Sequence, residues 1–168
     1  MEWEYSPAPE SSAIGDIKDR YLPFIDGTFK EGNGEDRDTI NPGTGKRLST
    51  VSTVNAADID RAVNAARQAY ENVWSDMPGA ERGKFLFRIA RGIAERSREL
   101  AVVETLDNGK PIKETRDFDV PAAAQHFFYH AGWADKLQHL GLGIAPRPLG
   151  VAGQVILWNF PLLMAAWK

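Results

Sequence analysis

The chain has 168 residues, 26% of them charged and 43% hydrophobic, with a formal net charge of −3 and no cysteine. This composition is ordinary for a globular protein large enough to bury a core, and the absence of any block of basic residues argues against a dedicated nucleic-acid binder. No disulfide, thiolate metal site or cysteine nucleophile can form within these residues, and no apolar run approaches the roughly 18 residues of a membrane span.

The N-terminal part of the sequence predicts a polar tail followed by short β elements. Residues 1–20 begin with acidic and polar residues rather than a secretory signal, so we expect a loose tail and a cytoplasmic location. An Asp-Gly pair at 26–27 suits a two-residue turn, which predicts a β-hairpin over 22–29. A turn rich in Gly, Asn and Pro over 40–46 leads into a predicted strand over 48–51.

Three helical regions are predicted next. Asn55 is a predicted N-cap for a helix that continues to Val73 with one apolar face. A second region, 80–107, stops at an Asn-Gly pair, and a third, 119–137, carries Pro121 only in its first turn. The apolar positions of the first helix are Ile59, Ala62, Val63, Ala66, Ala69, Tyr70 and Val73, and those expected on the inner side of the second region are Phe85, Ile89, Ile93, Leu100 and Val103.

The last predicted unit is a strand that runs into a helix. Residues 150–157 are apolar and rich in β-branched side chains, and Pro161 begins an apolar helix shortly after them. Asn159 would then lie at the carboxyl end of the strand, where open α/β sheets place ligand chemistry. One strand and one incomplete helix cannot close a parallel sheet, so the sequence predicts the opening of a larger α/β protein, cut within a βα unit.

Residue types alone leave the role of this C-terminal region open. The Asn159 carboxamide could cap the helix begun by Pro161 or stabilise a developing oxyanion, and on these grounds capping is favoured. A single helix face that favours core packing contains Phe160, Leu163, Met164 and Trp167.

Other titratable residues favour structural interpretations. His126 and His130 have a spacing seen in zinc sites, but the metalloprotease pattern needs Glu where Phe127 stands, so two packed or solvated histidines are favoured. Glu104 and Asp107 are interpreted as acids on a helix surface, one turn apart, rather than as a catalytic pair.

Several segments of the sequence are similar to segments of the aldehyde dehydrogenase superfamily. They are residues 24–27, 41–45, 58–63, 104–111, 127–136 and 148–168, and the last of them contains GQVILWNFPLLMAAWK. These segments follow in the family's order and spacing over about residues 20–168. The chain is therefore identified as the N-terminal portion of a member, with the start of the family's Rossmann-like doubly wound α/β domain.

The resemblance implies an oxidoreductase that converts an aldehyde to a carboxylic acid with NAD or NADP. In full-length members a cysteine attacks the aldehyde, the oxyanion is stabilised while hydride leaves for the nicotinamide, and a glutamate-activated water hydrolyses the thioester. Because this chain has no cysteine, we expect it to be inactive alone, and we expect a homo-oligomer for the full-length protein. The aldehyde and the choice between NAD and NADP would be set further along the sequence.

The resemblance also implies roles for individual residues. Asn159 has the position of the oxyanion-stabilising amide, and Lys168 has that of the lysine beside the nicotinamide ribose. The positions that contribute to the cofactor cleft are Ile156, Leu157, Trp158, Asn159 and Lys168, and those that line the aldehyde tunnel are Phe160, Met164 and Trp167. Leu157 stands where most relatives have proline, a change that frees the local backbone and adds a hydrogen-bond donor.

The expected organisation has four parts. A tail over 1–20 precedes the hairpin and helices of the cofactor-binding domain over 21–136, a shortened oligomerisation-type connection over 137–149, and the first core strand with the start of its helix over 150–168. The alternative is a non-catalytic binding or interaction module derived from such an enzyme. A lone nucleotide-binding module is disfavoured because no G-x-G-x-x-G follows a predicted strand.

Overall fold

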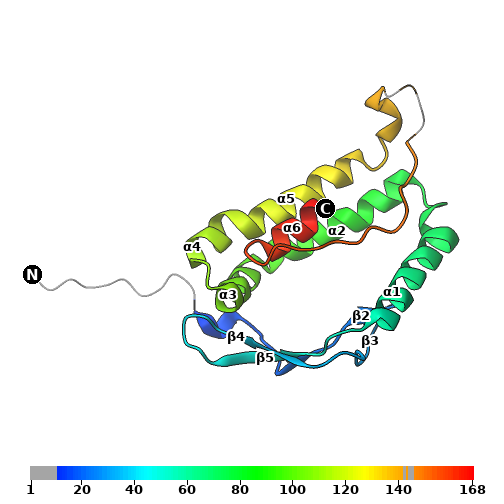
Figure 1. Ribbon diagram of the computed structural model, residues 1–168. Coiled ribbons are helices and arrows are strands. Elements are labelled where there is room, and N and C mark those ends of the chain that lie inside the picture. The colour runs from blue at the N-terminus through cyan, green and yellow to red at the C-terminus, as the bar shows by residue number, and fades with distance from the viewer. Residues whose placement is uncertain (1–10, 142, 144–145) are drawn as a thin grey trace, which may run out of the picture.

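The computed structural model describes residues 11–141, 143 and 146–168, so the first ten residues of the predicted tail lie outside it. A layer of helices lies above a small layer of strands, and helix α1 stands at one side of the molecule (Figure 1). In the described part of the predicted tail, a short 3-10 turn, η1 (Ser12–Ile14), packs against α3 (Ser97–Asn108).

The strands form two separate small sheets. In the first, β1 (Arg20–Tyr21) pairs in parallel with β5 (Arg47–Val51), and β4 (Arg37–Ile40) pairs with the other edge of β5 in the antiparallel sense. The predicted strand over 48–51 is therefore confirmed as the central strand of this sheet.

The second sheet is the predicted hairpin. Strand β2 (Phe24–Ile25) pairs with β3 (Thr28–Phe29), and the Phe24 and Phe29 rings lie 4.8 Å apart. The turn residues Asp26 and Gly27 both have positive φ, 53° and 73°, as a type I′ turn requires. The hairpin prediction is confirmed, because the Asp-Gly pair tolerates this conformation at low cost.

Helix α1 (Ala56–Ala69) begins where the sequence predicted. The Asn55 side chain accepts a hydrogen bond from the Asp58 N–H, and the Asp58 carboxylate accepts one from the Asn55 N–H, which forms a complete capping box. The helix then widens into a π-helical turn, η2 (Tyr70–Trp74), so its last predicted turn has a different hydrogen-bonding pattern.

The second predicted helical region is two helices. α2 (Gly79–Glu95) and α3 are separated at Arg96, whose φ and ψ of −102° and 17° leave the helical range. The prediction of one continuous region was wrong: α2 packs mainly on α5 (Val120–Trp133), whereas α3 packs mainly on η1 and the turn before α5 and touches α5 itself less.

The predicted inner side of α2 is also partly wrong. Phe85 and Ile89 are 43% and 45% exposed, whereas Gly83 and Ala90 are buried. A methyl group at Gly83 would lie 2.9 Å from the Ala131 carbonyl oxygen. The contact between α2 and α5 therefore includes a close backbone approach at Gly83, and beside it the Phe87 and Phe128 rings meet edge to face at 5.1 Å.

Helix α5 begins after a longer helical lead than predicted. α4 (Ile112–Glu114) and a π-helical turn, η3 (Thr115–Asp119), run directly into it, and Pro121 lies in its first turn as expected. The π-helical turn places the Val120 N–H against the Thr115 carbonyl. The helix ends at Trp133, and a 3-10 turn, η4 (Leu137–Leu140), follows it.

The strand predicted over 150–157 is absent from the described residues. The segment is extended and belongs to no sheet (Figure 1). The Val155 and Leu157 residues are 86% and 55% exposed. The prediction was wrong here because a strand needs a neighbour for its N–H and C=O groups, and no described strand lies beside this segment. Helix α6 (Pro161–Trp167) begins at the predicted proline.

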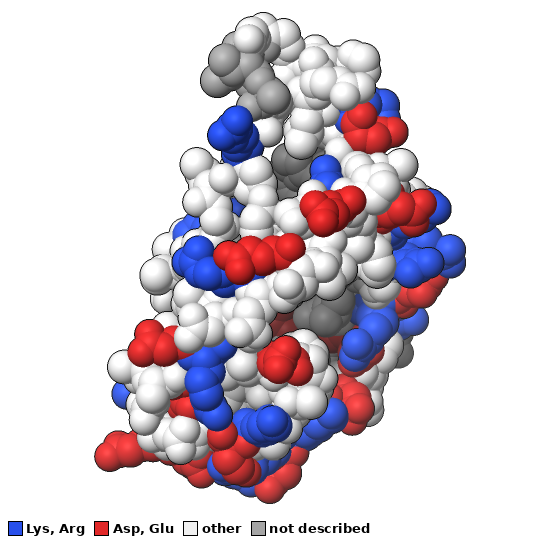
Figure 2. Space-filling view, turned by 90° about the vertical axis from the view of Figure 1, so that its right-hand side faces the viewer, with Lys and Arg blue, Asp and Glu red and all other residues white. Residues whose placement is uncertain are grey.

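The described surface carries charges of both signs. On the face shown in Figure 2, acidic and basic side chains are interspersed with uncharged residues. Within the described part of the chain, every helix is too short or too polar to cross a membrane.

Candidate functional site

Asn159 lies in a tight turn immediately before α6. The turn is closed by the Phe160 N–H, which donates to the Leu157 carbonyl at 3.3 Å. Asn159 is exposed and lines a hollow of about 310 Å³ that opens between this turn and the end of α3. Its carboxamide makes no hydrogen bond with any described residue.

The capping role that residue type alone favoured is not what the structure shows. The N-cap of α6 is Phe160, with φ and ψ of −144° and 53°, and no side chain caps the helix. The Asn159 amide therefore keeps its donors and its acceptor available beside the hollow.

The loop after α3 holds this turn in place. The Asn108 side chain donates to the Trp158 carbonyl at 3.5 Å and accepts from the Lys110 N–H at 2.8 Å. Gly109 ends α3 with a φ of 78°, and a methyl group there would come within 2.8 Å of the Pro42 ring. Only glycine combines this backbone conformation with such close packing.

A buried charged cluster lies behind the loop. Its members are Glu104 on α3, Lys110 after α3 and Asp119 at the end of η3, and we call it the Glu104 cluster. The Lys110 ammonium forms an ion pair with Asp119 and lies 3.5 Å from the centroid of the Phe160 ring. Glu104 is 6% exposed, so its interpretation as a surface acid was wrong: it lies on the face of α3 that also buries Ala101.

The electrostatics of this cluster are unbalanced, because two buried carboxylates face one ammonium. One oxygen of Glu104 and one of Asp119 have no donor when both groups are ionised, whereas a proton on Glu104 lets it donate a hydrogen bond to Asp119. Burial, and then the neighbouring Asp119, raise the pKa of Glu104 to about 7, while Lys110 and the Leu162 N–H act in the opposite direction.

The sequence analysis missed this cluster as a feature of the site. The signal available in the sequence was an acid among the apolar positions of α3, followed six residues later by a lysine. That signal does not predict which side chains contact each other, because Asp119 lies on a separate element of the fold.

The remaining predicted site residues are spread over the C-terminal segment. Trp158, Asn159 and Phe160 line the hollow together, whereas Met164, Trp167 and Lys168 do not. The Lys168 ammonium donates to the Val155 carbonyl at 2.7 Å and so links the end of α6 to the extended segment. Ile156 is half-buried, while Leu157 and Trp158 are exposed.

The apolar face of α6 is only partly a packing surface. Leu163 is buried at 4% exposure, Phe160 and Met164 are half-buried, and Trp167 remains 61% exposed. The Trp167 ring stacks on His126 at 5.4 Å with an angle of 22° between the planes. Leu163 is therefore the buried anchor of this face, and the tunnel candidates beside it keep exposed surface.

His126 and His130 are both engaged by aromatic rings. His126 stacks on Trp167, and His130 lies edge-on to Tyr129 at 5.2 Å. No group of three or more metal-ligating side chains is found in the part of the chain that the structure describes.

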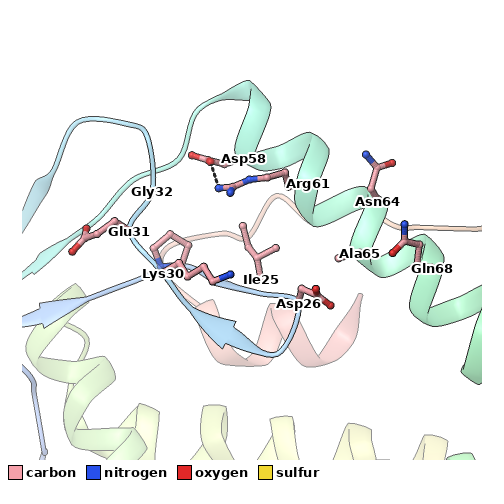
Figure 3. A pocket seen from close by; sticks show the side chains of 11 residues that line it. Ile25, Asp26, Lys30, Glu31, Gly32, Asp58, Arg61, Asn64, Ala65 and Gln68 are labelled. Carbon is pink, nitrogen blue, oxygen red and sulfur yellow. Dashed lines mark hydrogen bonds and ion pairs between the residues drawn. The ribbon is translucent and has the colours of Figure 1, made fainter.

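A second hollow, of about 280 Å³, lies between the β2–β3 hairpin and α1 (Figure 3). Asp58 at its wall is fully buried and accepts hydrogen bonds from the backbone and the side chain of Asn33, at 2.7 and 2.6 Å. With the Asn55 N–H and the Arg61 guanidinium it completes what we call the Asp58 knot. The Asn33 N–H, and then the other donors, lower the pKa of Asp58 to about 2, so the knot is a structural feature.

The chain matches a known protein family over most of its length. The family model described as "Aldehyde dehydrogenase family" matches residues 29–168. The chain belongs to the aldehyde dehydrogenase family. The family prediction made from the sequence segments is confirmed.

Relatives show how much of a family member the chain covers. An aldehyde dehydrogenase of Alternaria alternata is 40% identical over 154 residues, and the mitochondrial family 2 member B4 of Arabidopsis thaliana is 43% identical over 155 residues. Each match covers 86% of this chain, but only 31% and 29% of the respective relative. The chain thus spans about a third of the length of the curated relatives that it matches.

Solved structures support the fold. The NAD+ complex of an aldehyde dehydrogenase from Bacillus cereus is 37% identical, with a TM-score of 0.82, over 96% of this chain and 35% of that one. A Burkholderia cenocepacia gamma-glutamyl-gamma-aminobutyraldehyde dehydrogenase gives a TM-score of 0.83 at 37% identity, over 94% of this chain and 34% of that one. The predicted fold class, a partial α/β domain of the aldehyde dehydrogenase fold, is confirmed.

Proposed function

We propose that this chain supplies the oxyanion-stabilising and cofactor-cleft residues of an NAD(P)-dependent aldehyde oxidation. The observation that carries the proposal is the position of Asn159, an exposed residue that lines an open hollow and whose carboxamide is used neither for capping nor for any other described hydrogen bond. An amide N–H aimed at developing negative charge stabilises a transition state more than a ground state.

The cofactor is NAD or NADP, and bound there it would supply the hydride acceptor. The carbonyls of Leu157 and Trp158 already accept hydrogen bonds, but the backbone N–H groups of residues 156–158 have no acceptor among the described residues. Lys168 reaches back to the adjoining backbone at Val155. These groups fit a role in holding the nicotinamide end of a dinucleotide. Phe160, Met164 and Trp167 keep apolar surface that suits the wall of an aldehyde tunnel.

The nucleophile and the general base lie outside these residues in this proposal. The 168 residues contain no cysteine, so the thiolate that attacks the aldehyde must come from another stretch of polypeptide. The chain alone is then inactive, and it acts in the cytoplasm as part of a homo-oligomeric enzyme. Residues 137–149 are the shortened connection, between the hairpin and helices of 21–136 and the core unit of 150–168.

A chimera tests the proposal. Residues 1–168 replace the corresponding N-terminal third of the Bacillus cereus aldehyde dehydrogenase, and NADH formation is measured at 340 nm with an aldehyde substrate. We expect Asn159→Ala to lower kcat by about 10²–10³-fold, because one oxyanion donor is lost, while NAD+ binding is retained. The matched control is Ala165→Ser on the exposed side of α6, which should leave kcat unchanged.

Three outcomes would count against the proposal. An unchanged kcat in the Asn159→Ala chimera would rule out the oxyanion role of Asn159. Aldehyde-dependent NADH formation by the 168-residue chain alone would show that no second stretch of polypeptide is needed. If the chimera folds but has no activity, and the 168-residue chain is stable by itself, the result supports the non-catalytic interaction module instead.

A further inference from the structure

We infer that Lys110 is a positioning residue for Asn159: the Glu104 cluster holds its ammonium against the Phe160 ring and thereby fixes the turn that presents the Asn159 carboxamide. The inference rests on the proposed function for its catalytic consequence, but the brace itself is a property of this chain.

The first step is the burial of Lys110. Its side chain is 12% exposed, whereas lysine side chains are seldom buried without a partner. The ion pair with the fully buried Asp119 supplies that partner. Because Asp119 is held at the junction of η3 and α5, the ammonium is fixed relative to the main helical layer.

The second step is the contact with Phe160. The Lys110 ammonium lies 3.5 Å from the ring centroid, within the range of a cation–π interaction. Phe160 is the N-cap of α6 and directly follows Asn159, so a fixed ring restrains the backbone next to the carboxamide. On the other side of Asn159, the Trp158 carbonyl is held by Asn108. The loop from Asn108 to Lys110 therefore braces the turn on both sides.

The third step is the charge around the ammonium. Asp119 on η3, Glu104 on α3 and Glu114 on α4 are the titratable groups that face or border Lys110 in the described structure. Glu104 is a second buried acceptor with an unpartnered oxygen, close to the Leu162 N–H of α6. A protonated Glu104 donates a hydrogen bond to Asp119, so that Asp119 is held between Glu104 and the Lys110 ammonium.

NMR spectroscopy on the 168-residue chain tests the brace directly. The readouts are the Asn159 side-chain amide signals and the Lys110 Cε–H signals, which the Phe160 ring current should shift upfield. Lys110→Met keeps the stem and removes the charge, and Lys110→Arg restores a cation that stacks on a ring. We expect Lys110→Met to move the Asn159 amide signals and Lys110→Arg to return them toward the wild-type positions.

Two further variants complete the test. Lys113→Met on the exposed side of α4 is the matched control and should leave the Asn159 signals unchanged. Phe160→Leu removes the ring, and it should move the Asn159 signals and abolish the Lys110 shift. If circular dichroism shows that Lys110→Met does not fold, the Phe160→Leu variant still tests the inference. Unchanged Asn159 signals in a folded Lys110→Met or Phe160→Leu chain overturn the inference.

The chimera separates this inference from the proposed function. We expect Lys110→Met to lower kcat by about tenfold with KM within twofold, because misplacement of a catalytic group affects the reaction more than binding. Lys110→Arg should recover most of that loss. If Asn159→Ala lowers kcat and Lys110→Met does not, the positioning role is wrong. If neither lowers kcat, the proposed function is wrong, whatever the NMR signals show.

Discussion

The Asp58 knot and the Glu104 cluster both bury a carboxylate on a helix, with 0% and 6% of the residue exposed. Asp58 receives donors from two backbone N–H groups, one amide and one guanidinium, and its pKa falls to about 2. Glu104 lies beside Asp119, which has the Lys110 ammonium as its ion-pair partner, and burial and this neighbouring carboxylate raise the pKa of Glu104 to about 7. Burial alone therefore does not decide the charge of a carboxylate; the supply of donors does.

The position on the helix contributes to this difference. Asp58 lies in the first turn of α1, where N–H groups point outward and favour negative charge. Glu104 lies in the second half of α3, where the backbone offers no such donors, and only the first turn of α6 turns an N–H toward it. The Asp58 knot therefore stabilises the fold. The Glu104 cluster lies next to the candidate site, and its two carboxyl groups have fewer donors than they can accept from.

The largest expected effect is that of Asp58→Ala. It removes the capping box and leaves the Asn33 and Asn55 donors without their acceptor, so we expect the melting temperature to fall by roughly 5–10 °C. Differential scanning calorimetry measures this change. Asp60→Ala, at an exposed position of the same helix, is the control and should change the melting temperature by less than about 2 °C. Equal effects of the two variants would contradict a special role for the knot.

A smaller effect, visible as a pH dependence, is expected for Glu104→Gln. The folded-state pKa of Glu104, about 7, lies above the ordinary value of 4.5, so the folded chain keeps a proton that the unfolded chain has released. The stabilisation is fully present below pH 4.5 and is lost as the pH rises to about 7. Glutamine cannot titrate, so the variant should lack this contribution, which is at most about 1.4 kcal/mol per pH unit.

Urea unfolding at several pH values between 4.5 and 8 measures the slope for Glu104→Gln and for the wild type. Glu114→Gln, at an exposed position beside the candidate site, is the matched control and should keep the wild-type slope. Identical slopes for wild type and Glu104→Gln would show that the Glu104 cluster is not the titrating unit.

The smallest effect is expected for Arg61→Ala. Its guanidinium pairs with Asp58 (Figure 3). The Arg61 side chain is nevertheless 57% exposed. Asp58 keeps the Asn33 and Asn55 donors without it, and ion pairs that reach solvent contribute little. We expect the melting temperature to change by less than about 2 °C. A larger fall would mean that charge pairing, rather than the backbone and amide donors, stabilises the knot.

Local signals predicted several elements correctly. The Asp26-Gly27 turn, the Asn55 cap and the stop of α3 at Gly109 each depend on the conformational preferences of one or two residues. The break at Arg96 was missed because no Gly or Pro marks it, and because it lies between two helices that pack mainly on different partners.

The candidate site was likewise predicted only in part from the sequence. Asn159 and Phe160 were found from a continuous motif, and the structure places both on the hollow. The burial of Glu104 and the reach of Lys110 to Phe160 were not predicted, since they join residues from separate elements. The unpaired segment over 150–157 was mistaken for a strand because its composition favours strands, whereas pairing requires a neighbour.

The sequence by itself determined the family, the hairpin, the caps and the identity of the candidate oxyanion donor, because each is written in short contiguous stretches with narrow backbone preferences. Only the tertiary structure decided which acids are buried, which of them lack donors and which lysine braces the turn before α6. Burial and hydrogen-bond supply depend on side chains that meet in space after long loops of chain have closed.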